Sequence, residues 1–274
     1  MDNNSDDLWY WYLTGVKRES FPENLWRHFM DLQRVYRFFP GAPRCFECGI
    51  PLAGPSAFIL RPRGSRPASF SPRFCSMCED FAKSREAGAE VEATLLFADI
   101  RDSTPLAERI GTIKFKELIK RFYKTTSKVL IDHMAMVNRL MGDQVSAVFV
   151  PRFAGKDHAK IALHAAEELL RVTGHSDPNG PWIPVGVGIH TGTAYVGAVG
   201  SNEGVNEIAV LGSAANLTAR LSSQAKRGEI LISQESVKSA GLDTSNMEHR
   251  MLDLKGIDHP VSVEALQISG GASN

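Results

Sequence analysis

All four cysteines of the chain fall in two C-x2-C pairs, Cys45 with Cys48 and Cys75 with Cys78. Each pair can turn two thiolates towards one point, so two pairs can build a tetrahedral cage of four sulfurs. Ligands this soft favour zinc. Iron is the alternative, because the C-x2-C-G sequence also begins loops that bind iron or iron–sulfur clusters. The spacing therefore predicts a structural metal site with zinc as the expected ion, against the plainer alternative of four unrelated buried thiols.

Two aspartates stand where strand-like apolar runs end. Asp99 follows the run at 95–98 and precedes a turn with serine and threonine, and Asp143 belongs to a Gly-Asp turn between two short apolar runs. Carboxylates at neighbouring strand ends can share a pair of Mg²⁺ ions. The N–H groups of the turn after Asp99 can hold phosphate oxygens. Taken singly, each aspartate is more ordinary as a helix N-cap or a turn former.

Three further polar side chains in the C-terminal part of the chain are candidate functional residues. Asn216 and Arg220 lie four residues apart in L-G-S-A-A-N-L-T-A-R (211–220), so a helix there would point both the same way. Lys255 follows a predicted strand in L-D-L-K-G-I. Alone, Arg220 and Lys255 would be ordinary surface cations.

The chain divides into three parts that must position these groups. Residues 1–40 are predicted to be helical, with a Ser20–Glu23 capping box. Residues 41–85 form the four-cysteine module, and residues 91–268 alternate strand and helix patterns after a linker near 80–90. The alternation, with hairpins at Gly142-Asp143 and Thr191-Gly192, favours an α/β sheet that contains antiparallel pairs.

Composition limits the function classes. The chain has 274 residues, 43% of them hydrophobic, and its 31 basic and 31 acidic side chains cancel. A disordered chain is excluded, and a general nucleic-acid or anionic-membrane binder is disfavoured as the main role. No apolar run approaches a membrane span and the N-terminus is no secretory signal, so we expect the cytoplasm and no membrane insertion. The stretch from Cys48 to Cys78 holds four arginines and no acidic residue, a pattern more typical of a solvated loop than of a phosphate site.

Four runs, in order, resemble the catalytic domain of class III nucleotidyl cyclases, the adenylate/guanylate cyclase family. They are F-A-D-I-R-D-S-T (97–104), R-L-M-G-D (139–143), G-V-G-I-H-T-G (186–192) and L-G-S-A-A-N-L-T-A-R (211–220). The resemblance covers residues 91–266 and implies an α+β, ferredoxin-like cyclase domain with a mixed, largely antiparallel sheet. It also implies a homodimer in which each site takes its two halves from opposite subunits.

The resemblance assigns roles position by position. It implies two Mg²⁺ or Mn²⁺ ions per site and a nucleoside triphosphate substrate. The implied residues are Asp99, Asp143 and the Ile100 carbonyl for the metals, Asn216 for the ribose, Arg220 for the reacting phosphate, and Lys255 for the triphosphate. His190 matches no catalytic position and is interpreted as structural.

The base pocket departs from the family pattern. Arg139 stands where adenylate cyclases have Lys and guanylate cyclases have Glu, and Ala209 replaces an Asp or Thr that reads adenine. Asp102 stands where the family usually has Gly. An arginine fork suits the carbonyl oxygens of uracil or cytosine, so the sequence favours UTP or CTP and the bacterial pyrimidine cyclases of antiphage signalling. ATP is the main alternative, followed by an inactive nucleotide sensor and a metal-dependent nucleic-acid-binding protein.

Overall fold

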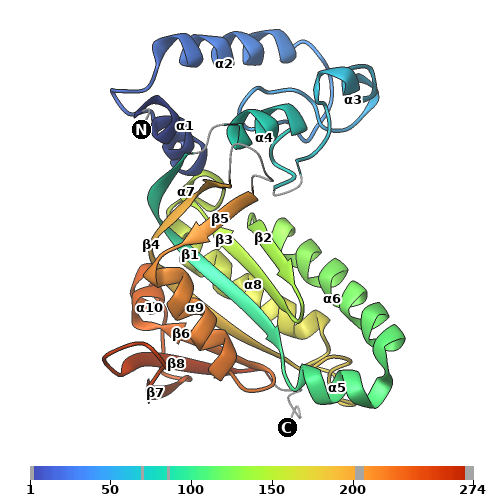
Figure 1. Ribbon diagram of the computed structural model, residues 1–274, viewed down its shortest axis with the longest axis vertical. Coiled ribbons are helices and arrows are strands. Elements are labelled where there is room, and N and C mark those ends of the chain that lie inside the picture. The colour runs from blue at the N-terminus through green and yellow to red at the C-terminus, as the bar shows by residue number, and fades with distance from the viewer. Residues whose placement is uncertain (1–2, 69–70, 85–86, 201–206, 269–274) are drawn as a thin grey trace. The chain divides into compact units, whose positions relative to one another are not determined.

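The structure is a computed structural model that describes residues 3–68, 71–84, 87–200 and 207–268 (Figure 1). The chain forms two compact units. The first comprises Met1–Val91 with Tyr195–Val210, and the second comprises Glu92–Ala194 with Leu211–Asn274. No helix in the described ranges is long and apolar enough to cross a membrane.

The first unit is mostly helical. Its elements are α1 (Asn3–Thr14), α2 (Glu23–Tyr36), α3 (Pro55–Ile59), the 3-10 turn η1 (Arg61–Arg63) and α4 (Ser76–Lys83). The ring of Trp11 lies 5.3 Å from that of Phe21, 5.5 Å from that of Trp26 and 5.2 Å from that of Phe29, centroid to centroid. This aromatic cluster joins α1 to α2, because neither helix could bury so much apolar surface alone.

The capping box predicted at Ser20 does not form. Helix α2 begins at Glu23, and Pro22 is its N-cap, with no hydrogen bond from a side chain. Pro22 holds an extended backbone (φ −59°, ψ 119°), so the N-cap of the helix lies two residues after Ser20, the N-cap that the capping box requires.

The sheet has eight strands in the order β2-β3-β1-β4-β6-β8-β7, with β5 paired to β4. The strands are β1 (Gly88–Ile100), β2 (Met136–Met141), β3 (Gln144–Phe149), β4 (Val185–Val199), β5 (Glu207–Leu211), β6 (Glu229–Ser233), β7 (Glu248–Leu252) and β8 (Val261–Gln267). The pairs β1–β3, β2–β3, β6–β8 and β7–β8 are antiparallel, while β4–β6 is parallel. This confirms a mixed, largely antiparallel α+β fold.

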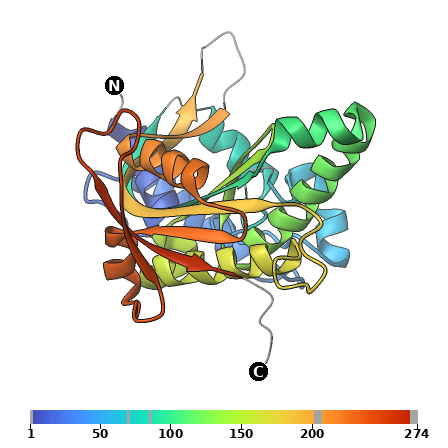
Figure 2. The same ribbon diagram turned by 90° about the horizontal axis from the view of Figure 1, so that it is seen from below.

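Helices cover both faces of this sheet. They are α5 (Ser103–Ile110), α6 (Thr112–Asp132), α7 (Pro151–Ala154), the 3-10 turn η2 (Gly155–Asp157), α8 (His158–Val172), α9 (Ser213–Gln224) and α10 (Gln234–Ala240). Along β6, Ile230 and Ile232 join the core under α6 and α8, while Leu231 joins the core under α9. Figure 2 shows β4 and β6 between α9 and α8. The period-2 alternation of strand side chains supplies both cores.

Two glycines of β4 allow α9 to lie directly on the strand. A Cβ added at Gly186 would meet the carbonyl oxygen of Ala225 at 2.6 Å, and one added at Gly188 would meet the amide nitrogen of Ser222 at 2.4 Å. Any side chain at either position would push α9 off the sheet. The G-V-G run therefore fixes where the outer face of α9 points.

The hairpin predicted at Thr191-Gly192 is wrong, because β4 runs without a turn from Val185 to Val199. Buried hydroxyl groups hold Thr191 within the sheet. Its Oγ1 lies 2.8 Å from Oγ1 of Thr94 on β1 and 3.0 Å from Oγ of Ser236 on α10. Besides β1 and β6, β4 pairs with β5, a strand that the sequence pattern did not predict.

Candidate active site

Asp99 and Asp143 lie at the same end of two paired strands. Asp99 on β1 is opposite Gln144 on β3, the residue after Asp143. The amide of Ile100 donates to the carbonyl oxygen of Asp143 at 3.0 Å. The hairpin predicted at Gly142-Asp143 is confirmed, with Gly142 in the left-handed region (φ 60°). The structure thus brings the two carboxylates and Ile100 together, as a shared metal site requires.

The electrostatics of Asp99 show that the carboxylates influence each other. Burial raises the pKa of Asp99 above its ordinary value, the guanidinium of Arg101 acts against this, and the charge of Asp143 raises it further. Two carboxylates at one strand end repel each other unless cations lie nearby. Oxygen donors from side chains and a neighbouring backbone carbonyl form the donor set that Mg²⁺ prefers, so these residues fit such an ion.

Arg101 contributes to this site, and sequence reasoning missed it. Its guanidinium forms an ion pair with the Asp99 carboxylate, and Nη1 donates to the carbonyl oxygen of Ser223 in α9 at 2.7 Å. Arg101 therefore ties the strand end that carries Asp99 to α9. The available signal was its position two residues after Asp99, the spacing at which extended side chains share a face.

The turn after Asp99 orients the second carboxylate. The hydroxyl of Ser103, the first residue of α5, donates to Oδ2 of Asp143. Asp102 has a left-handed backbone (φ 53°, ψ 38°), which explains why the resembling family uses glycine there. Aspartate is one of the few other residues that adopts this conformation readily. Tyr123 of α6, also missed from sequence, donates its hydroxyl to the carbonyl oxygen of Gly142 at 2.7 Å.

Asn216, Arg220 and Lys255 belong to other elements than the two aspartates. Asn216 and Arg220 are both exposed on α9, one turn apart, and Lys255 is exposed between β7 and β8. Among the described residues, no hydrogen bond or ion pair links these three side chains to Asp99 or Asp143. One chain therefore presents two separate groups of candidate residues, the acidic end of β1 and β3 and the outer face of α9.

The two candidate base-reading positions lie on β2 and β5. The backbone of Arg139 pairs with Ser146 of β3, next to an irregularity in register between Val137 and Arg139. The side chain of Arg139 lies outside the described residues. Ala209 is half-buried on β5.

His190, interpreted from the sequence as structural, is buried on β4. Its Nδ1 atom lies 2.8 Å from the hydroxyl oxygen of Ser233.

The four cysteines of the first unit form one buried cluster, as predicted. Their Sγ atoms all lie within 4.8 Å of one another. The amide of Cys75 donates to Sγ of Cys45 at 3.3 Å, and that of Cys78 donates to Sγ of Cys75 at 3.4 Å. Such N–H···S contacts favour thiolates. Helix α4 places Cys78, because Cys75 is its N-cap.

The spacing of the sulfurs fits a single tetrahedral ion. Sγ of Cys48 and Sγ of Cys75 are 3.7 Å apart, and a tetrahedron with metal–sulfur bonds of about 2.3 Å has edges of about 3.8 Å. An iron–sulfur cluster places several atoms between its thiolates and needs wider spacing. Hydrogen bonds from Cys45 and Cys48 hold the pKa of Cys75 low, whereas hydrogen bonding with Cys45 raises the pKa of Cys48 and Cys78. A bound cation would displace these protons.

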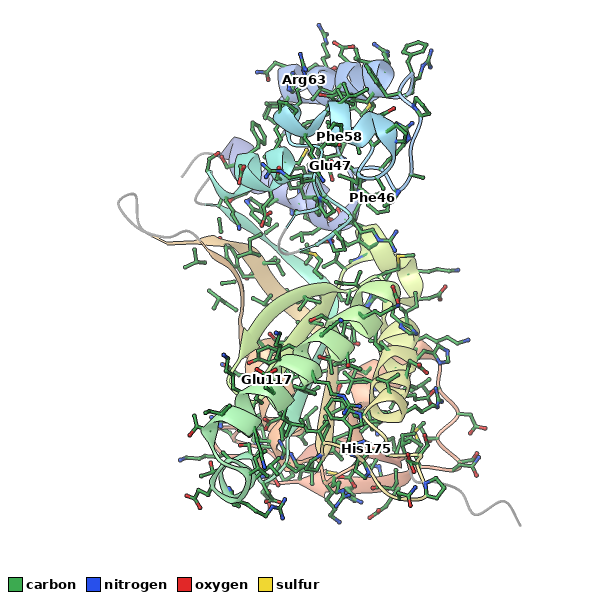
Figure 3. The ribbon with its side chains drawn as sticks, turned by 90° about the vertical axis from the view of Figure 1, so that its right-hand side faces the viewer. Phe46, Glu47, Phe58, Arg63, Glu117 and His175 are labelled. Atoms are coloured by element: carbon green, nitrogen blue, oxygen red, sulfur yellow. The ribbon has the colours of Figure 1, made fainter. Side chains whose placement is uncertain are left out.

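Glu47, between Cys45 and Cys48, was also missed by sequence reasoning. It is fully buried (0% exposed), and its charge, after burial itself, is a cause of the raised pKa of Tyr12 on α1. Figure 3 labels Glu47 inside the module. A buried carboxylate and a tyrosine thus lie beside the cysteine cluster.

Solved structures of nucleotide cyclases share this fold. The guanylyl cyclase Cya2 is 25% identical with a TM-score of 0.59, over 68% of this chain and 97% of that structure. The adenylyl cyclase CyaB from P. aeruginosa is 23% identical with a TM-score of 0.56, over 66% of this chain and 96% of that structure. Both likenesses span nearly the whole of the solved domain but leave about a third of this chain unmatched.

Sequence comparison points the same way. An adenylate cyclase of Anabaena cylindrica is 27% identical over 187 residues, which is 62% of this chain and 36% of the relative. The chain thus spans well under half the length of that relative, and only 8% of an adenylate cyclase of Dictyostelium discoideum. The family model of the adenylate and guanylate cyclase catalytic domain matches residues 86–262. The chain therefore belongs to the adenylate and guanylate cyclase catalytic domain family.

Proposed function

We propose that this chain is a nucleotidyl cyclase that converts a nucleoside triphosphate to its 3′,5′-cyclic monophosphate and pyrophosphate. The observation that carries the proposal is the pairing of Asp99 and Asp143 at one strand end, inside the segment that matches the family. The ribose 3′-oxygen forms a bond to the α-phosphorus, and the bond from that phosphorus to the bridging oxygen breaks. Pyrophosphate carries away the electron pair, and the 3′-hydroxyl proton is lost to solvent.

The residues of the chain divide this work. Two Mg²⁺ or Mn²⁺ ions, when bound, would lower the pKa of the 3′-hydroxyl and neutralise phosphate charge. Asp99, Asp143 and the Ile100 carbonyl would hold these ions, while Arg101 and Ser103 orient the two carboxylates. The protein needs little covalent chemistry, because positioning and charge stabilisation dominate phosphoryl transfer.

The second group of residues acts on the nucleotide itself. Asn216 would orient the ribose, Arg220 would neutralise charge on the reacting phosphate, and Lys255 would bind the triphosphate. All three are exposed, and within the described part of one chain none forms a hydrogen bond or ion pair with Asp99 or Asp143. The lack of such a bond within one chain is consistent with the homodimer that we propose, in which the acidic group of one subunit faces the α9 residues of its partner.

For the base, we propose a pyrimidine triphosphate, UTP or CTP, which would make the product a signal of the antiphage type. The support is chemical. Arg139 offers donors only, which suit pyrimidine carbonyl oxygens, and Ala209 has no side-chain acceptor for the adenine amino group. ATP is the alternative substrate.

Pyrophosphate release from ATP, GTP, CTP and UTP tests this proposal. We expect turnover with UTP or CTP, and a loss of about ten- to a hundredfold in Arg139→Ala, the worth of one charged hydrogen bond. Arg152→Ala, a cationic residue of α7, serves as the matched control. Production of cyclic AMP alone, with Arg139→Ala indifferent to the base, would establish ATP. No release from any of the four nucleotides would leave a nucleotide sensor without turnover.

For the cysteine cluster, we propose one structural zinc ion bound by Cys45, Cys48, Cys75 and Cys78. The 3.7 Å sulfur separation and the complete set of four buried cysteine sulfurs support a closed, non-catalytic site. We expect one zinc per chain by elemental analysis of purified protein. Chelation, or Cys75→Ser, should lower the melting temperature of the first unit. One iron per chain would replace zinc in this proposal, and metal-free protein would reject the site.

A further inference from the structure

The cysteine module carries a surface whose charge differs from that of the chain as a whole. Residues 34–78 contain seven arginines, no lysine and one carboxylate, that of buried Glu47. Five of the seven are exposed; Arg34 pairs with Asp31, whereas Arg37, Arg61, Arg63 and Arg66 make no ion pair with another described residue. The module is therefore cationic although the chain is neutral.

Large apolar side chains are exposed among these arginines. Phe38 is 75% exposed, Phe58 71% and Ile59 68%. Neighbouring residues anchor the backbone that presents them, since Ser56, Ala57 and Leu60 are buried. Single exposed hydrophobics are common on proteins, but adjacent ones on a short helix, held out by buried neighbours, mark an interaction surface.

The arginines and the apolar side chains belong to one region of the module. The guanidinium of Arg61 lies 5.5 Å from the ring centroid of Phe58, and that of Arg37 lies 5.0 Å from that of Phe38. Burial raises the pKa of Tyr36, and the charge of Arg63 opposes this, so Arg63 lies near the C-terminal end of α2. Figure 3 shows Phe58 and Arg63 on α3 and the turn that follows it.

We propose that this surface, the Arg–Phe tip formed by Arg37, Phe38, Phe58, Ile59, Arg61 and Arg63, docks on an anionic lipid bilayer. Phe58 and Ile59 enter the interfacial region, and the arginines bind headgroup phosphates. Charge complementarity selects an anionic partner. The aliphatic Ile59 beside Phe58 favours lipid over single-stranded nucleic acid, since bases stack on aromatic rings and gain little from an isoleucine.

Flotation of the full-length protein with vesicles tests this inference. We expect binding to phosphatidylcholine vesicles that contain phosphatidylserine, little binding to phosphatidylcholine alone, and loss of binding as salt is raised. Phe58→Ala with Ile59→Ala should weaken binding at least about tenfold. Arg61→Ala with Arg63→Ala should weaken it about thirtyfold, at roughly 1 kcal/mol for each cation near the bilayer.

Matched variants on α6 provide the controls. Ile113 is 80% exposed, and Lys114 and Lys116 are exposed cations on the same helix. Ile113→Ala, and Lys114→Ala with Lys116→Ala, should bind vesicles as the unchanged protein does. Phe38→Ala, at the end of α2, gives a second apolar variant that leaves α3 intact.

Three results would overturn the inference, and none depends on cyclase activity. The first is no binding to phosphatidylserine vesicles, and the second is equal weakening by the α6 variants. The third is tighter binding to a single-stranded oligonucleotide than to vesicles, lost in the same tip variants, which would make the tip a nucleic-acid site.

Discussion

Replacement of Asp143 by asparagine should reduce cyclic nucleotide formation below detection while the protein stays folded. The amide has nearly the same shape and can still accept from the Ser103 hydroxyl, but it lacks the negative charge that two divalent cations require. The backbone bond from the Ile100 amide to the carbonyl oxygen of residue 143 is unaffected. Turnover at saturating Mg²⁺ or Mn²⁺ and a thermal melt measure the two effects. Asp99→Ala should likewise lose cyclic nucleotide formation while the protein stays folded.

The matched control is Asp132→Asn at the end of α6, where the carboxylate is exposed and paired with Lys128. Its activity should equal that of the unchanged chain. Near-normal turnover in Asp143→Asn would refute the two-metal site, whereas loss of the cooperative melt would point to a structural role instead.

Replacement of Arg220 by alanine should lower the rate about 10²- to 10³-fold, as expected when one charge contact to the transition state is removed. The fold should survive, because Arg220 is exposed on α9 and the helix is fixed by its contact with Gly186 and Gly188. Arg171→Ala on α8 is the control, since among the described residues the ion pairs of that arginine are with Glu167 and Glu168 of the same helix.

Mixing the two inactive proteins, Asp99→Ala and Arg220→Ala, tests whether the sites are shared. In a homodimer with two composite sites, a mixed dimer has one intact site and one doubly altered site. Random exchange makes half of the dimers mixed, so about a quarter of the original activity should return. If nothing returns in mixtures shown to exchange subunits, the shared site is wrong, although the metal assignment would stand on the single variants.

The sequence alone predicted the features that depend on spacing along the chain. The spacing within each C-x2-C pair predicted two thiolates turned towards one point, and Gly142-Asp143 predicted the β2–β3 hairpin that carries Asp143. Both follow from local geometry, because two ligands three residues apart, or two strands joined by a tight turn, need no distant partner to meet. The order of four motifs similarly predicted the family that the comparisons show.

Only the tertiary structure decided the features that depend on contacts between distant segments. Thr191 and Gly192 look like a turn, but Thr94 and Ser236 hold Thr191 inside a continuous β4. In the sequence, Arg101 is one charged residue among many. In the fold, its guanidinium donates to the carbonyl oxygen of Ser223 on α9, 122 residues away. The physical reason is that the need to satisfy a buried polar group outweighs local conformational propensity. The partners that satisfy these groups come from segments far away in the sequence, which meet only in the folded sheet.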